Sequence, residues 1–161
     1  MENDFVRKRA LLLWQEGQKH HQIGDLSRAV DFYTKSIAVC PTAESYTFRG
    51  WAYSYMGRVE DAISECKKAI AVDPSFGNPY NDIGSYLIVQ GKTSEAEEWL
   101  QRAKTALRYD LRHFPYMNLG RLYAAKGHLV QAMKEFEQAL EICPSERMCA
   151  AALDNVKKML H

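Results

Sequence analysis

The sequence has no surplus of one charge and no long apolar run. Its 21 basic and 20 acidic side chains nearly cancel, so no net field attracts the chain to nucleic acid or to an anionic membrane surface. No stretch stays apolar for long enough to form a transmembrane helix, and Gln15 and Glu16 stop the short apolar run at residues 10–14. An apolar content of 47% still suffices for a folded core in one domain. We therefore expect a folded domain that binds no nucleic acid and does not insert into a membrane.

The sequence has no cysteine motif typical of a zinc site or a redox pair. Cys40, Cys66, Cys143 and Cys149 are separated by 25, 76 and 5 intervening residues, which fits neither a zinc site nor a redox pair. We expect four unpaired cysteines that act mainly as small buried apolar side chains. Unpaired thiols favour a reducing compartment, so the expected location is the cytoplasm.

Catalytic motifs are missing as well. The sequence contains no phosphate-binding glycine loop, no metal-binding helix signature and no nucleophile elbow. His20 and His21 are the only adjacent histidines, and neighbouring helix positions face different directions. We expect no enzyme, no cofactor and no metal site. Catalysis stays open only through an unrecognised site that uses one of these two histidines.

What the sequence does contain is a repeat. A glycine is followed by a second glycine seven residues later, an alanine five further on and a small residue seven after that; the copies start 33, 34 and 36 residues apart. The four copies are Gly17, Gly24, Ala29 and Ser36; Gly50, Gly57, Ala62 and Ala69; Gly84, Gly91, Ala96 and Ala103; and Gly120, Gly127, Ala132 and Ala139. A fixed period of this length indicates a stack of equivalent units.

Each unit predicts two helices. A helical apolar period runs past the first glycine, the second glycine breaks the chain, and another periodic stretch follows. The first glycine and the alanine allow the two helices to pack closely, beside large side chains such as Tyr33, Leu100 and Phe136. Proline ends three of the four units, at positions 41, 74 and 144.

These residues resemble the tetratricopeptide repeat family, whose pattern over about 34 residues is W-x2-L-G-x2-Y, then A-x3-F, then P. The fourth unit carries the pattern in Tyr116, Leu119, Gly120, Tyr123, Ala132, Phe136, Ala139 and Pro144. The resemblance covers about residues 10–144 and implies a right-handed all-α solenoid of four helix–turn–helix units. We expect a single domain over 1–161, with repeats at about 10–42, 43–76, 77–112 and 113–145 and a capping helix at about 146–160.

Two regions depart from a regular stack. The third unit has Arg108 where its neighbours have proline, and the glycine interval that follows is longer. This predicts that the second helix of the third unit runs on through Arg108 or Tyr109. After Pro144, an apolar stripe predicts a helix that covers the last repeat; a docking helix for a partner is the alternative. The stripe comprises Met148, Ala152, Val156 and Met159.

In this family the first helix of each repeat lines a concave groove that binds peptides, so the resemblance implies a protein or peptide partner. Members that hold a chaperone's C-terminal carboxylate use lysine, arginine and asparagine at five groove positions. Those positions are Trp14, Gln18, Phe48, Asn78 and Asp82 in one frame, and Thr47, Trp51, Asp82, Phe114 and Asn118 in the other. Neither frame supplies a cation, so a chaperone carboxylate is disfavoured as the ligand.

The groove is instead expected to be aromatic and rich in amides. Aromatic side chains bury large anchors at binding interfaces, and asparagine amides both donate to and accept from a peptide backbone. The candidate binding residues are Trp14, Gln18, Phe48, Trp51, Tyr55, Asn78, Asn81, Asp82, Asn118 and Arg121. Trp14 and Phe48 are equally suited to packing between helices, or against Phe5 if the N-terminal stretch folds over the groove. A self-associating structural subunit is the alternative function, and the chain is expected to be a monomer or a homodimer.

Overall fold

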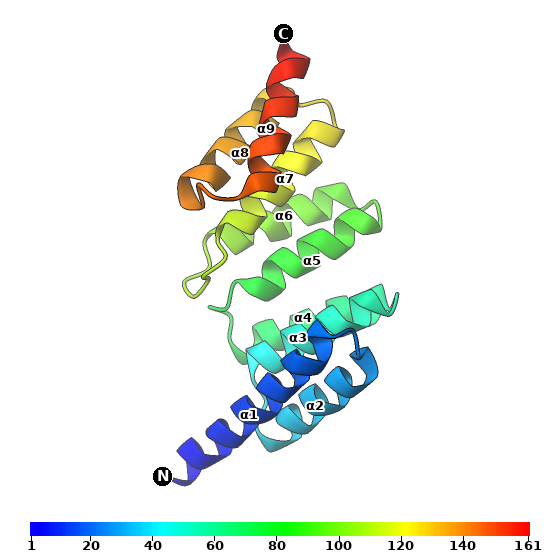
Figure 1. Cartoon of the computed structure of the whole chain (residues 1–161), viewed down its shortest axis with the longest axis vertical. Helices are drawn as coiled ribbons and strands as arrows, with labels where there is room; N and C mark the ends of the chain where they lie inside the picture. The colour runs from blue at the N-terminus through cyan, green and yellow to red at the C-terminus, as the bar shows by residue number, and fades with distance from the viewer.

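The computed structural model describes all 161 residues and contains nine α-helices. They are α1 (Glu2–Gln22), α2 (Leu26–Val39), α3 (Ala43–Tyr55), α4 (Val59–Val72), α5 (Asn78–Val89), α6 (Thr93–Lys104), α7 (His113–Ala125), α8 (Leu129–Ile142) and α9 (Arg147–Leu160). Consecutive helices pair into four hairpins that stack along one axis, with α9 after the last hairpin (Figure 1). The predicted right-handed all-α solenoid with a terminal helix is confirmed.

The repeated glycines have two distinct structural tasks. The second glycine of each unit closes the hairpin turn with a φ between +75° and +81°, a backbone conformation that strongly favours glycine. The first glycine lies where the two helices of a hairpin touch. A Cβ added to Gly120 would lie 2.5 Å from Cε1 of Phe136, and one added to Gly84 would lie 2.6 Å from Leu100. The predicted pairing of small residues with large ones is therefore present.

Helix α9 covers the last hairpin, but through a different stripe from the one predicted. Its buried residues are Cys149, Leu153 and Val156, which join the largest apolar cluster of the protein. Met148 and Met159 are exposed, by 67% and 66%. The predicted stripe is thus wrong at its two methionines, whereas Val156 is buried and Ala152 packs, partly buried, against the same cluster. The buried stripe places the small Cys149 thiol against α8, where Sγ donates to the Phe136 carbonyl at 3.4 Å.

The joint between the third and fourth hairpins is a loop and not a helical extension. Helix α6 ends at Lys104, so the prediction that it runs on through Arg108 or Tyr109 is wrong. The Arg112 guanidinium caps the end of α6 by donating to the carbonyls of Lys104 and Ala106. The loop then folds back, with the Arg108 amide donating to Ser75 and the Gly77 amide donating to the Arg108 carbonyl.

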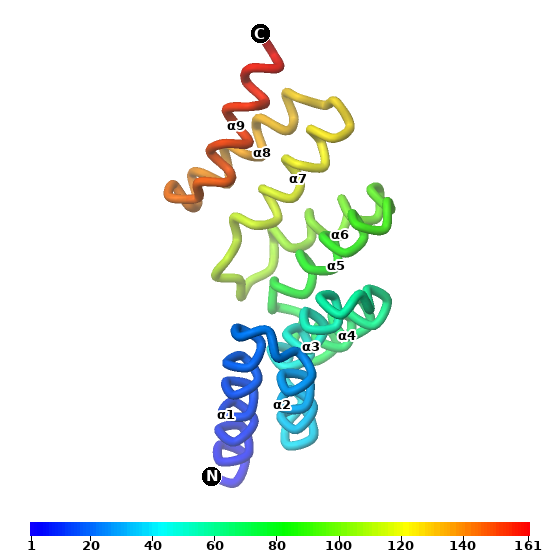
Figure 2. Tube along the Cα trace, turned by 45° about the vertical axis from the view of Figure 1, so that its right-hand side comes forward, coloured from blue at the N-terminus to red at the C-terminus, as the bar shows by residue number.

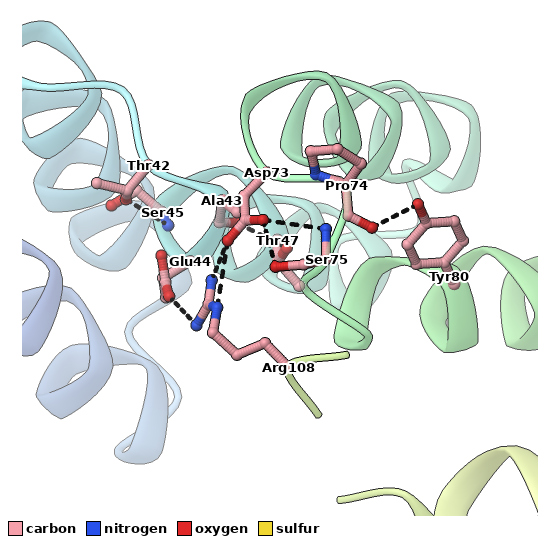
Figure 3. A network of polar contacts seen from close by, with 10 residues as sticks. All are labelled: Thr42, Ala43, Glu44, Ser45, Thr47, Asp73, Pro74, Ser75, Tyr80 and Arg108. Carbon is pink, nitrogen blue, oxygen red and sulfur yellow. Dashed lines mark hydrogen bonds and ion pairs between the residues drawn. The ribbon is translucent and has the colours of Figure 1, made fainter. Parts of the chain in front are cut away.

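Arg108 ties this loop to the second repeat (Figure 3). Its guanidinium lies 2.7 Å from both Asp73 and Glu44, and it stacks 4.4 Å above the Phe76 ring. Hydrogen bonds from Ser75 and Arg108 lower the pKa of the Asp73 carboxyl. One side chain therefore connects segments that are 35 and 64 residues away in the chain.

We expect Arg108→Ala to lower the melting temperature by about 2–4 °C, because two ion pairs and a stacking contact together contribute about 1 kcal/mol at a half-exposed site. Circular dichroism melts at low and high salt measure the loss and its screening. Arg28→Ala is the matched control, since it removes only an exposed contact with Asp25 at 3.6 Å. Equal melting temperatures for the two variants would show that the loop is held without Arg108.

Candidate peptide-binding groove

The first helices of the four hairpins line one side of the solenoid. Helix α1 contacts α3, α3 contacts α5, and α5 contacts α7, so these helices form a continuous row (Figure 2). The candidate residues of the sequence analysis all lie on this row. They fall into two groups, an aromatic group on α1 and α3 and a polar group on α5 and α7.

The aromatic group borders a cavity of about 440 Å³ between the first two repeats, called here the aromatic pocket. Its lining residues are Gln18, His21, Gln22, Gly24, Leu26, Tyr33, Phe48, Trp51 and Tyr55. Trp51 and Tyr55 are 42% and 64% exposed, which is unusual for such large apolar side chains. The aromatic pocket therefore brings together four of the predicted residues: Gln18, Phe48, Trp51 and Tyr55.

The aromatic rings of Trp14, Phe48, Trp51 and Tyr55 contact one another in sequence. Phe48 lies 5.2 Å from Trp14 and 5.6 Å from Trp51, both nearly perpendicular, and Trp51 lies 5.8 Å from Tyr55. Such ring contacts stabilise this arrangement of the side chains. Trp14 and Phe48 are partly buried where α1 meets α3, so these two rings also pack the helices together. Phe5 is 71% exposed on a straight α1 and does not cover the groove.

Trp14 faces a different cavity from the other aromatic residues. It lines a second space of about 570 Å³, bounded by the first half of α1, the start of α3 and the end of α4. Its Nε1 is buried without a hydrogen-bond partner. Trp14 therefore contacts the Phe48 ring and does not itself line the aromatic pocket.

The amide residues of α5 and α7 bind each other. Asn118 donates from Nδ2 to Oδ1 of Asn81 at 2.9 Å, which joins the two helices across the groove. Asn81 is only 8% exposed, whereas Asn78 is partly exposed at the first position of α5. Arg121 is exposed on α7 and makes no ion pair. The amides thus stiffen this half of the groove, and fewer of their groups remain free for a ligand.

Asp82 is a partly buried carboxylate in the middle of the row. Burial raises the pKa of Asp82 to about 7, while a hydrogen bond from Asn81 acts in the opposite direction. Burial also raises the pKa of the Tyr86 phenol, and the Asp82 charge adds to the rise. The Tyr86 hydroxyl is buried without a hydrogen-bond partner. Asp82 lies on α5, which contacts α3, the helix whose Trp51 and Tyr55 border the aromatic pocket.

Comparison with known families identifies the type of repeat in this helical stack. Models described as tetratricopeptide repeat match residues 43–76 and 113–146. The chain belongs to the tetratricopeptide repeat family. None of its nine helices combines the length and the hydropathy that a membrane-spanning helix needs.

Relatives and structures of the tetratricopeptide repeat family resemble different portions of the chain. The small glutamine-rich tetratricopeptide repeat-containing protein 2 of Mycosarcoma maydis is 34% identical over 88 residues, which are 54% of this chain and 25% of the relative. The chain therefore spans about a quarter of the length of that relative. Two solved structures share the fold at lower identity.

PilF of Pseudomonas aeruginosa gives a TM-score of 0.86 at 22% identity, over 97% of this chain and 69% of PilF. The second repeat domain of Spaghetti, bound to the HSP90 peptide SRMEEVD, gives a TM-score of 0.60 at 24% identity. That match covers 66% of this chain and 99% of the Spaghetti domain. Similarity at this level shows the fold and does not identify a ligand.

His21 lines the aromatic pocket but is not among the binding residues predicted from the sequence. Its ring lies 4.6 Å from Trp51, and Nδ1 lies 3.2 Å from the Tyr33 hydroxyl. Burial lowers the pKa of His21, and Nε2 is buried without a partner. The spacing from Gly17 does place His21 on the groove side. No cluster of three or more His, Cys, Asp or Glu side chains forms around it.

Proposed function

We propose that this protein is a non-enzymatic adaptor that binds a segment of another protein in its concave groove. Tetratricopeptide repeat proteins generally mediate protein–protein interactions. The observation that carries the proposal is the aromatic pocket, where Trp51 and Tyr55 remain exposed above about 440 Å³ of space. Concave sites lined by aromatic rings hold large apolar side chains at a low cost in conformational entropy, because aromatic side chains have only two χ angles. The proposed ligand is an extended or helical peptide with an aromatic or aliphatic anchor.

The ligand class differs from that of the Spaghetti domain, whose peptide ends in an acidic sequence. The lining of the aromatic pocket contains no lysine or arginine, and the central charge of the groove is the carboxylate of Asp82. Both features oppose a bound carboxylate. We place the protein in the cytoplasm, because its four cysteines are all free thiols and a reducing compartment keeps them so.

Replacing Trp51 and Tyr55 together by alanine is expected to remove the partners recovered by affinity purification and mass spectrometry. Loss of two anchor residues weakens a typical interface by about 2–4 kcal/mol, or at least about 30-fold. The melting temperature is expected to change little, since both side chains are substantially exposed. Leu107→Ala with Val130→Ala is the control, because it removes two exposed apolar side chains outside the pocket. A large loss of melting temperature with unchanged partners would contradict the proposal.

Self-association is the second candidate, and the length of α1 favours it. Helix α1 has 21 residues against 14 in α2, so its first turns extend beyond the hairpin (Figure 1). Phe5 and Leu12 are exposed on α1, by 71% and 61%. Sedimentation over a range of concentrations separates the candidates. A monomer at all concentrations supports the adaptor, whereas a stable dimer that blocks the groove supports the structural subunit.

A further inference from the structure

Asp82 differs from every other shielded carboxylate in the protein. Nine carboxylates are at least partly buried, and in eight of them an oxygen lies within 3.8 Å of a basic nitrogen. The eight are Glu16, Asp25, Glu44, Glu65, Asp73, Glu97, Glu135 and Glu146. Asp82 makes no ion pair. Shielded charges in folded proteins are normally paired, so the missing cation is the unusual feature of this residue.

The surroundings of Asp82 do not supply a cation from within the protein. The groups that interact with its charge are the Asn81 amide, the Cys66 thiol and the phenols of Tyr86 and Tyr109. None of them carries a positive charge. Arg121, the groove cation on α7, is exposed and unpaired. The carboxylate therefore keeps its desolvation cost in the free protein, and a cation brought by a ligand would offset that cost.

The position of Asp82 links this charge to the aromatic pocket. Tyr55 borders the aromatic pocket and also interacts with the Tyr86 phenol, which in turn interacts with Asp82. The two features thus lie on neighbouring first helices, α3 and α5, and neighbouring helices pack about 8–10 Å apart. A peptide of a few residues spans that distance, at about 3.3 Å for each extended residue. One bound segment can therefore reach both.

We propose that the segment bound in the groove carries a lysine or arginine a few residues from its apolar anchor. The anchor occupies the aromatic pocket beside Trp51 and Tyr55, and the basic side chain pairs with the carboxylate of Asp82. This inference rests on the proposed peptide-binding function and specifies in addition that the bound peptide carries a positive charge. It also gives the groove its selectivity, because an acidic side chain at the same place would meet an unpaired carboxylate and bind weakly.

The test uses a phage-displayed library of random 12-residue peptides, selected separately on four proteins. The proteins are the wild type, Asp82→Asn, Asp82→Lys and Trp51→Ala. The wild type is expected to enrich sequences with an aromatic or aliphatic residue and a basic residue at a constant spacing. Asp82→Asn keeps the apolar preference and loses the basic one, whereas Asp82→Lys favours an acidic residue at that spacing. Asp31→Asn, which removes an exposed carboxylate on α2, is the matched control and keeps the wild-type preference.

Affinity measurements on the most enriched peptide then separate the two proposals. Changing its basic residue to glutamine is expected to weaken binding to the wild type about tenfold or more, and to change binding to Asp82→Asn by less than about twofold. Enrichment of apolar anchors without a basic residue, or an equal loss on both proteins, overturns the inference about charge and leaves the peptide-binding function standing. If no sequence is enriched on the wild type relative to Trp51→Ala, the proposed function itself fails. Circular dichroism confirms that each variant is folded.

Discussion

Replacing Gly120 by leucine is expected to lower the free energy of unfolding by about 3 kcal/mol, measured by urea denaturation. Even a Cβ at this position would lie 2.5 Å from the Phe136 ring, and Phe136 is only 1% exposed in the largest apolar cluster. A full leucine side chain forces α7 and α8 apart. The gain in helix propensity over glycine, about 1 kcal/mol, offsets only part of that strain.

A double-mutant cycle with Phe136 tests whether the two residues act as a pair. Phe136→Ala alone is expected to cost about 3–5 kcal/mol, because it leaves a cavity at the centre of the hairpin. The double variant is expected to be more stable than the sum of the two losses by at least about 1 kcal/mol, since leucine fills part of that cavity. Gly127→Ala is the control: no atom lies within 4 Å of its added Cβ, and its φ of +77° predicts a loss of about 1 kcal/mol from backbone strain alone. Additive losses in the cycle would mean that Gly120 is not required for contact with Phe136.

The same pairing explains why the hairpins could be predicted from the sequence. A glycine on one helix and a large side chain sixteen residues later, as in Gly84 and Leu100, form a contact that the chain repeats. The second unit is the exception, with the small Cys66 at the large position. There Gly50 faces the Ala62 backbone and Glu65 instead, and Glu65 is buried in an ion pair with Arg49 at 2.7 Å. Local spacing predicts the hairpin, whereas the substitute contact depends on tertiary structure.

The loop after α6 could not be predicted, because it too depends on tertiary contacts. Nothing within residues 105–112 breaks a helix as strongly as proline or glycine does, so periodicity favoured an extended helix. The loop is held instead by partners distant in the sequence, above all the carboxylates of Asp73 and Glu44.

For α9, the sequence offers two adjacent stripes of apolar residues. The choice between them depends on the shape of the hairpin beneath, which admits Cys149 and Leu153.

The candidate site also has a part that sequence spacing predicts and a part that depends on tertiary structure. Spacing from the repeated glycines was sufficient to place Gln18, Phe48, Trp51 and Tyr55 around one pocket, because the groove side of each first helix is fixed by its packing side. It could not show that Asn81 and Asn118 bind each other, since side-chain rotamers decide that contact. Nor could it show that Asp82 lacks a cation. Both facts require the three-dimensional positions of charges on neighbouring helices.

Replacing Asp82 by asparagine is expected to raise the free energy of unfolding by about 1–3 kcal/mol at pH 8, because the variant removes a shielded charge that has no partner. In the wild type, burial raises the pKa of the folded-state carboxyl to about 7, against about 3.9 for an unfolded chain. Between these values the folded state binds more protons than the unfolded state. The contribution of Asp82 to stability is therefore fully present below about pH 4 and is lost as the pH rises through 7. Contact of the carboxyl with water keeps the effect below the full value of the shift.

Urea denaturation at pH 4.5, 6, 7 and 8 measures this dependence. The advantage of Asp82→Asn over the wild type is expected to grow steadily with pH and to be small at pH 4.5. Asp31→Asn removes an exposed carboxylate on α2 and is expected to follow the wild type throughout. A variant that is less stable than the wild type at pH 8 would show that the Asp82 charge is already compensated within the protein. A gain in stability together with loss of the preference for basic peptides would identify Asp82 as a residue kept for binding at a cost to the fold.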